Sequence, residues 1–223
     1  MQKLVFIIVI LTLFSGCASI GGAKRYQVEN TIVSEAYPSA TFVVSNEFQY
    51  YDSSENVGTS STDPQTTTSA SNYSNEFFLF SKPTGAEPQR FFAVQFLQLN
   101  KPRWTWTRDF EWTGRGVVSG SINTAIGEME VFTTFASMAD IINGFGLPLS
   151  SFSSEPCAIV STFRQIPSGM ARYKYLMHYI EPIDCERMNQ FAYGGGRLTR
   201  TGERRIDMHL RNASQDTLIV SGD

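Results

Sequence analysis

The chain has few of the side chains from which hydrolytic and metal sites are usually built. It contains two histidines, His178 and His209, and neither lies in the His-Glu-x-x-His motif that would hold zinc. It also has no Gly-x-Ser-x-Gly nucleophile motif. The glycine run at 194–196 is not followed by the Lys-Ser or Lys-Thr pair of a phosphate-binding loop. We therefore expect a protein that is not an enzyme, with no catalytic residue and no metal ligand.

Charge is also scarce, and this bears on the class of partner. Charged residues make up 17% of the sequence, and the formal net charge is −3. The chain therefore has no overall positive charge that would attract nucleic acid. Five arginines make the stretch 197–211 basic. This stretch could be a face for an anionic envelope polymer, a lipid headgroup or a protein partner, although a solvated face is the simpler interpretation.

Long apolar runs are missing except at the start of the sequence. There, Lys3 is followed by an apolar segment from Leu4 to Phe14. The segment is shorter than the roughly 20 apolar residues that a membrane-spanning helix needs, and its length suits the hydrophobic region of a signal peptide. The small residues Ser15 and Gly16 would let a peptidase approach the backbone.

The sequence Leu13-Phe14-Ser15-Gly16-Cys17 resembles the lipobox of bacterial lipoproteins. The resemblance implies that residues 1–16 are removed as a signal peptide and that Cys17 carries the only cofactor, a covalent lipid with palmitate-type acyl chains. Two or more acyl chains give stable membrane anchoring. In this family a residue other than Asp after the cysteine, here Ala18, implies sorting to the cell outer membrane, facing the periplasm or the surface. An ordinary cleaved signal and an uncleaved N-terminal anchor stay open as alternatives.

The rest of the sequence predicts one domain. Residues 17–25 are small and flexible and would form a tether, and 26–223 would form a single β-rich envelope domain. Aromatic residues, at 13%, favour strands. The Ser- and Thr-rich segment 52–75 has too little apolar surface to offset its ordering entropy, so we expect a disordered loop there.

Short strands are predicted along most of this domain. Apolar and polar residues alternate over 41–51, as in a half-buried strand that Asn46 interrupts. The nearly continuous apolar run at 90–99 predicts a strand buried on both faces. Further strands are expected at 76–81, 103–113, 117–122, 127–134, 158–165 and 172–180, with short helices at 136–143 and 184–193.

The C-terminal part and the overall class follow from the same patterns. Ile206, Met208 and Leu210 alternate with polar residues, which favours a hairpin over a helix, with a return strand at 217–220. Consecutive short strands with short connections are typical of antiparallel sheets. The predicted fold is therefore α+β and β-rich, an antiparallel sheet or sandwich with a few short helices. A closed β-barrel is the alternative.

Two cysteines are left once Cys17 is assigned to the lipid. Cys157 precedes the expected strand 158–165, and Cys185 follows the expected strand 172–180. An antiparallel hairpin would bring them together, and an oxidising periplasm favours a bridge. We therefore predict a disulfide between Cys157 and Cys185, which would add about 2–4 kcal/mol to stability.

The strand expected at 103–113 offers a candidate binding face. Trp104, Trp106, Arg108 and Trp112 would share one side of it. Flat indole rings could stack on sugar rings, and the arginine could bind hydroxyl groups. The simpler interpretation is that these aromatic side chains belong to the core of a sheet.

These features together favour a membrane-anchored envelope lipoprotein that acts as a non-catalytic accessory or binding module. Its partners would be the membrane, through the lipid, and an envelope protein or polymer. The first alternative is a carrier that holds an apolar ligand inside a β-barrel. The second is an envelope hydrolase whose site is dispersed along the sequence.

Overall fold

The computed structural model describes residues 25–37, 39–58, 73–83, 89–100, 105–106, 115–145, 156–166, 172–192 and 197–221. These residues form two antiparallel sheets and three helices. The fold is therefore α+β and β-rich, as the sequence predicts. Within this part of the chain, no helix has the length and apolar character needed to cross a membrane.

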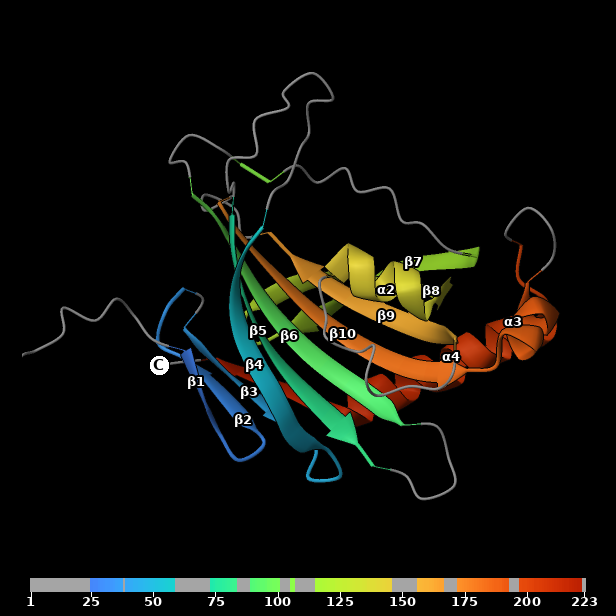
Figure 1. The fold of residues 1–223 in the computed structure, drawn as a ribbon, viewed down its shortest axis with the longest axis horizontal. Coiled ribbons are helices and arrows are strands. Elements are labelled where there is room, and N and C mark those ends of the chain that lie inside the picture. The colour runs from blue at the N-terminus through green and yellow to red at the C-terminus, as the bar shows by residue number, and fades with distance from the viewer. Residues whose placement is uncertain are drawn as a thin grey trace, which may run out of the picture.

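The larger sheet has seven strands in the order β4-β5-β6-β10-β9-β8-β7, and all neighbours are antiparallel. It consists of two meanders that join where β6 pairs with β10, and it curves strongly along its length (Figure 1). β4 and β7 each pair with one neighbour, so the sheet is open and the closed-barrel alternative is wrong. The strands are β4 (Gln49–Gly58), β5 (Tyr73–Lys82), β6 (Arg90–Leu99), β7 (Arg115–Thr124), β8 (Gly127–Ser137), β9 (Cys157–Gln165) and β10 (Tyr173–Ile183).

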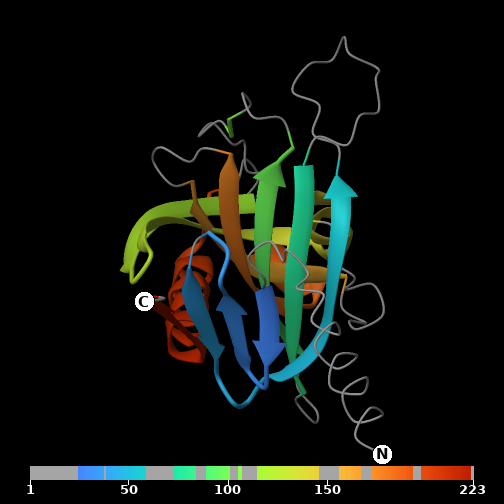
Figure 2. The same cartoon turned by 90° about the vertical axis from the view of Figure 1, so that its left-hand side faces the viewer.

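The smaller sheet has four strands in the order β1-β2-β3-β11 and packs against one face of the larger sheet (Figure 2). We call this the inner face. Phe42 of the small sheet meets Phe96 of the large sheet edge to face, with ring centroids 5.5 Å apart. The strands are β1 (Arg25–Val28), β2 (Thr31–Ser34), β3 (Ala40–Val44) and β11 (Thr217–Ser221).

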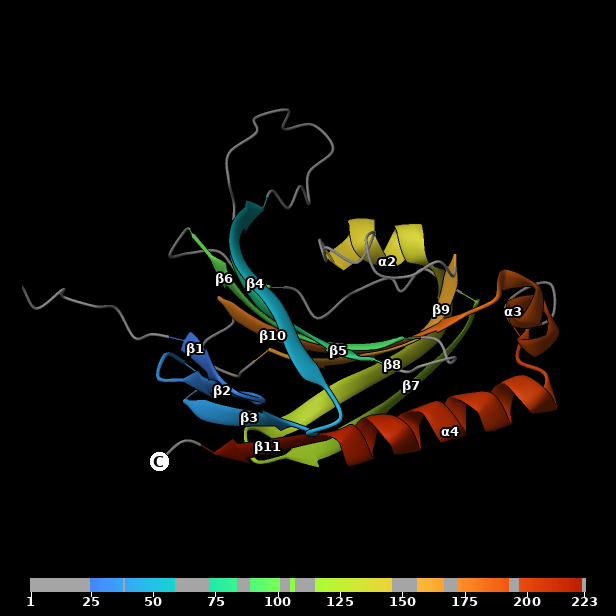
Figure 3. The ribbon, with the colours of Figure 1, turned by 60° about the horizontal axis from the view of Figure 1, so that its bottom comes forward.

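The helices cover both faces of the large sheet (Figure 3). α4 (Arg200–Asp216) lies across the inner face and leads directly into β11. α2 (Met138–Phe145) packs on the opposite, outer face, where Ile141 joins a cluster with Phe77 and Leu79 of β5. α3 (Cys185–Phe191) lies at the end of the sheet and precedes α4.

Alternation of side chains along the strands explains why both faces are covered. Phe78 and Phe80 of β5 belong to the inner cluster, whereas Phe77 and Leu79 belong to the outer one. β6 is buried on both sides along most of its length, as its nearly continuous apolar sequence predicts. The core is therefore two apolar layers with the large sheet between them.

The strand predicted at 41–51 is two strands in different sheets, so this prediction is wrong. β3 ends at Val44 and β4 begins at Gln49, with Asn46 in the turn between them. The side chain of Asn30 stabilises this turn by donating to the carbonyl oxygens of Ser45 and Phe48, at 3.0 and 2.7 Å. The interruption of the alternation at Asn46 was the signal of a break.

The hairpin preferred over a helix near the C-terminus is also wrong. Residues 200–216 form α4, whose buried positions Gly202, Ile206, His209 and Ala213 follow helical spacing. Met208, which the strand pattern placed beside Ile206, is 44% exposed. The return strand at 217–220 is confirmed as β11, but it pairs with β3.

The other predicted elements mostly match the structure. The strands expected at 76–81, 90–99, 117–122, 127–134, 158–165 and 172–180 are confirmed, and the two short helices are α2 and α3. β4 continues to Gly58 and β5 begins at Tyr73, so strands occupy both ends of the expected loop 52–75. The centre of that loop and most of the strand expected at 103–113 lie outside the described residues.

Candidate functional site

A groove of about 530 Å³ opens on the inner face, between the β7–β8 hairpin and α4. Its floor is made by β8, β9 and β10, and one side is made by α4. β7, the edge strand, forms the other side. The described lining residues are Val118, Ser119, Gly120, Ser121, Ile122, Asn123, Thr124, Ala125, Val131, Thr133, Phe163, Met177, Leu210 and Ser214.

The floor of the groove is built by positions that alternate toward the inner face. Val131 of β8 is opposite Phe163 of β9, and Phe163 is opposite Met177 of β10. Their side chains belong to the inner core cluster, against which Leu210 of α4 also packs. The groove is therefore a gap in the inner apolar layer, which the small sheet and α4 fill elsewhere.

None of the described lining residues is ionisable at neutral pH. Among the lining residues, the polar side chains are hydroxyls, as on Thr124, Thr133 and Ser214, and one amide, that of Asn123. The hydroxyls are weak nucleophiles by themselves, and no described lining residue is a general base that would activate them. The groove can hold an uncharged apolar chain, and its volume falls within the roughly 300–1,000 Å³ that is usual for ligand sites.

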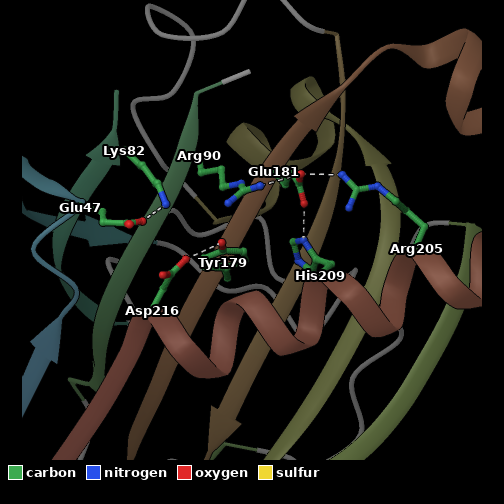
Figure 4. A network of polar contacts seen from close by, with 8 residues as sticks. All are labelled: Glu47, Lys82, Arg90, Tyr179, Glu181, Arg205, His209 and Asp216. Atoms are coloured by element: carbon green, nitrogen blue, oxygen red, sulfur yellow. Dashed lines mark hydrogen bonds and ion pairs between the residues drawn. The ribbon is translucent and has the colours of Figure 1, made fainter. Parts of the chain in front are cut away.

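A buried carboxylate holds α4 in place across the sheet (Figure 4). Glu181 of β10 accepts a hydrogen bond from Nδ1 of His209 at 3.1 Å. Its other oxygen accepts from Arg205 at 2.5 Å and lies 3.6 Å from Arg90 of β6. One side chain therefore links the centre of the large sheet to two successive turns of the helix.

The charge states follow from burial and from these partners. Burial alone would raise the pKa of Glu181, but the hydrogen bond from His209 and the charge of Arg205 lower it to about 2. Burial lowers the pKa of His209, although Glu181 opposes the shift. The imidazole is therefore neutral at pH 7, and its contact with Glu181 is a hydrogen bond from a neutral donor.

The C-terminal end of α4 is fixed by a second contact to the same strand. The hydroxyl of Tyr179 donates to Asp216 at 2.8 Å, and its ring lies edge-on to His209, with centroids 5.0 Å apart. Burial and the bond to Asp216 raise the pKa of Tyr179, so it stays protonated. Because Asp216 directly precedes β11, this contact also fixes where β11 begins.

The N-terminal end of α4 is fixed through α3 and the predicted disulfide. Cys157 of β9 and Cys185 of α3 are bridged, with Cα atoms 5.2 Å apart, so this prediction is confirmed. Gly202 lies so close to Phe191 of α3 that an added Cβ would be 2.1 Å from its carbonyl oxygen. Thr199 caps the helix by accepting from the N–H of Gly202 at 3.0 Å.

His178 of β10 is buried on the outer face of the large sheet. Its Nε2 is 2.8 Å from Oε1 of Gln95, which only accepts, so Nε2 carries the proton. Nδ1 then accepts from the hydroxyl of Thr162 at 3.0 Å. Burial and the charge of Lys174 lower the pKa of His178 to about 3, so it serves as a neutral link between three strands.

Only one member of the predicted aromatic binding face is described. Trp106 is half-buried, and its indole N–H donates to the carbonyl oxygen of Arg172 at 3.0 Å. The ammonium group of Lys174 lies 3.9 Å from its ring centroid, so one ring face is already occupied. Burial and the charge of Arg164 lower the pKa of Lys174 to about 8.

The remaining predicted site residues are Cys17, Trp104, Arg108 and Trp112, and all four lie outside the described residues. The described part of the chain contains no cluster of three or more histidine, cysteine or acidic residues placed to hold a metal ion. The predicted tryptophan face therefore stays a prediction, of which the structure describes Trp106 alone.

Sequence reasoning did not find the groove, because the groove depends on the position of α4. The signal that was available is the composition of β7, which has no charged residue from Val117 to Thr124. Comparisons of the chain with protein-family models, curated proteins and solved structures each found no match.

Proposed function

We propose that this chain is a bacterial envelope lipoprotein, anchored through Cys17 in the outer membrane, whose domain binds without catalysis the apolar part of another envelope component. The ligand chemistry that suits the groove is an uncharged hydrocarbon chain, such as a lipid acyl chain. The observation that carries this proposal is the groove beside α4, which is apolar in its floor and has no ionisable group among its described lining residues.

The physical basis is the transfer of apolar surface out of water. Each methylene group that leaves water for an apolar site gains about 0.8 kcal/mol. Phe163 and Met177 provide a floor that is already formed, because the sheet beneath them is fixed by its neighbours on both sides. Binding therefore needs little ordering of the protein, which leaves more of this gain as affinity.

Contacts at three separate places hold α4, and this supports binding in a preformed groove. Glu181 holds the middle of the helix, Tyr179 holds its C-terminal end, and α3 holds its N-terminal end. Leu210 and Ser214, which line the groove, therefore have fixed positions relative to the floor.

Photocrosslinking in the membranes of the producing cell would test the ligand. A benzophenone amino acid placed at Ser214, which is exposed and lines the groove, should form adducts with lipid acyl chains that mass spectrometry identifies. The matched control is Gln215, which is exposed on the same helix but does not line the groove. Equal lipid adducts at both positions, or none at Ser214, would overturn the groove proposal.

The anchor needs a separate test. Cys17→Ala should move the protein from the membrane fraction to the soluble fraction, and the mature chain should lose its acyl mass. Unchanged membrane fractionation would contradict the anchor and leave the groove proposal standing. The intact mass of native protein would also show whether the chain begins at Cys17.

A further inference from the structure

β7 is a long sheet edge with little protection against pairing. Every residue from Val117 to Asn123 is exposed, and Val117, Val118 and Ile122 are among the most exposed large apolar residues, at 42%, 37% and 40%. The strand has no charged residue from Val117 onward, and its irregular pairing is confined to the start, between Arg115 and Val118. An uncharged apolar edge of this kind is a template for another strand.

The opposite edge of the same sheet shows the protection that β7 lacks. β4 carries acidic residues, and its pairing is irregular between Tyr50 and Asp52. The carboxylate of Asp52 also accepts a hydrogen bond from the backbone N–H of Ser53 at 2.8 Å, which occupies a donor near this edge. Charge and irregular pairing are the usual means by which proteins prevent edge association. The difference indicates that β7 is an edge available for a partner.

The alternation of hydrogen-bonded pairs shows which backbone groups of β7 point outward. The N–H of Leu99 donates to the carbonyl of Arg172 at 2.9 Å, so these residues form a hydrogen-bonded pair of β6 and β10. Following the alternation through β9 and β8 with the observed registers directs the backbone of Gly120 toward β8. The N–H and C=O groups of Ser119 and Ser121 therefore point away from the sheet.

We propose that two copies of this chain pair antiparallel along β7, about a two-fold axis at Gly120. The sequence Val118-Ser119-Gly120-Ser121-Ile122 is nearly symmetric about its central glycine. In this register Val118 faces Ile122 of the second copy, and Ser119 faces Ser121. Apolar side chains then meet on the inner face, hydroxyls meet on the outer face, and no like charges are opposed.

This register also gives the outward-pointing backbone N–H and C=O groups hydrogen-bond partners. Ser119 and Ser121 of the two copies would exchange hydrogen bonds through the groups that point outward. Gly120 would face Gly120 of the second copy as a non-hydrogen-bonded pair, in which Cα atoms are about 4.5 Å apart. The two-fold axis is perpendicular to the sheet, so both inner faces lie on the same side and the two grooves become neighbours.

Cysteine crosslinking of the full chain in its own membranes tests the register. Gly120→Cys should form a reducible dimer on oxidation, because about 4.5 Å lies within the range that disulfides span. An added Cβ at Gly120 meets no atom within 4 Å in its own chain, so the variant should fold. The matched control is Asn123→Cys, whose two thiols would be about 20 Å apart in this register. We expect about ten-fold or more dimer from Gly120→Cys than from the control.

A proline substitution tests the pairing without a new thiol. Ser121→Pro removes an N–H that points outward, so it should keep the β8 pairing and the melting temperature but convert the dimer to monomer in native mass spectrometry. Ile122→Pro, which removes an N–H directed at β8, should instead destabilise the domain itself.

Three results would overturn the proposal. The first is Gly120→Cys protein that stays monomeric after oxidation, and the second is a dimer that survives Ser121→Pro. The third is a disulfide from the thiol introduced by Gly120→Cys to a different protein, which would mean that the edge takes a strand from another partner. A peptide pair crosslinked through position 120 of both copies, together with loss of the dimer in Ser121→Pro, would support the two-fold pairing.

Discussion

Nδ1 of His209, in the middle of α4, donates a hydrogen bond to the carboxylate of Glu181, in the large sheet, over 3.1 Å. Both side chains are buried, and the same carboxylate also binds Arg205 one helical turn earlier. The position of the helix that borders the groove therefore depends on one acidic residue in β10.

Removing that carboxylate should strongly destabilise the fold. Glu181→Ala leaves Arg205 and His209 without their partner, and breaking a buried ion pair from one side costs about 3–5 kcal/mol. Urea unfolding at pH 7 measures this loss. The control is Glu203→Ala on an exposed position of the same helix, which should change stability by less than about 0.5 kcal/mol. Similar losses of unfolding free energy for both variants would show that Glu181 stabilises the fold no more than an exposed carboxylate does.

His178 should make the protein less stable in mild acid. Its pKa is lowered from 6.5 to about 3 in the fold, so the unfolded chain binds the proton first as the pH falls. The contribution of neutral His178 to the free energy of unfolding is fully present above pH 6.5. It declines by up to about 1.4 kcal/mol per pH unit down to about pH 3. Glu181, whose pKa is lowered from 4.5 to about 2, adds to this decline only below pH 4.5.

Burial lowers the pKa of His209 as well, so urea unfolding at pH 7, 6 and 5 needs a variant that isolates His178. His178→Gln keeps a polar side chain between Gln95 and Thr162 but has no group to titrate. The difference in unfolding free energy between the native chain and this variant should shrink as the pH falls. A difference that stays constant with pH would show that His178 does not titrate in this range.

The disulfide should stabilise the domain by restricting the unfolded chain. Cys157 and Cys185 are 28 positions apart. A disulfide that closes a loop of that length is expected to add about 2–4 kcal/mol to the free energy of unfolding. Replacing both with alanine should lower the urea midpoint without changing oligomeric state. In the native chain, both thiols should resist alkylation until a reductant is added, and two freely reactive thiols would contradict the bridge.

Two glycines should respond in opposite ways to the same substitution. Gly202→Ala places a Cβ 2.1 Å from the carbonyl oxygen of Phe191, so α3 and α4 must separate. The cost of separating the two helices should outweigh the roughly 1 kcal/mol by which alanine stabilises a helix relative to glycine. Gly120→Ala meets open space in a strand and should be neutral or stabilising. Thermal unfolding of both variants tests the contrast, which fails if Gly202→Ala is stabilising.

The parts of the fold that sequence patterns predicted are those set by neighbouring residues. The hairpin of β9 and β10 placed Cys157 beside Cys185. The open ends of two strands in a hairpin lie next to each other regardless of the rest of the fold. The nearly continuous apolar run of β6 required cover on both faces, and the structure provides it with the small sheet and α2.

The parts that were missed depend on distant contacts. In α4, Ile206, Met208 and Leu210 fit a strand pattern. The helix is distinguished by the burial of His209 and Ala213 and by the exposure of Met208, which depend on contacts with other elements. The groove could not be predicted, since it lies between residues of β7 and α4 that are far apart in the sequence. The contacts of His178 also depend on distant residues, because its partners, Gln95 and Thr162, come from two other strands.

The pairing of β11 with β3 has a consequence for how the chain folds. Nearly the whole described sequence lies between these two strands, so the small sheet cannot close until α4 and β11 have been made. Until then, the inner-face side chains of the large sheet, such as Phe78 and Phe96, lack their cover. Contacts so distant in sequence form slowly. The folding chain is therefore most prone to aggregate in the interval before residues 217–221 pair with β3.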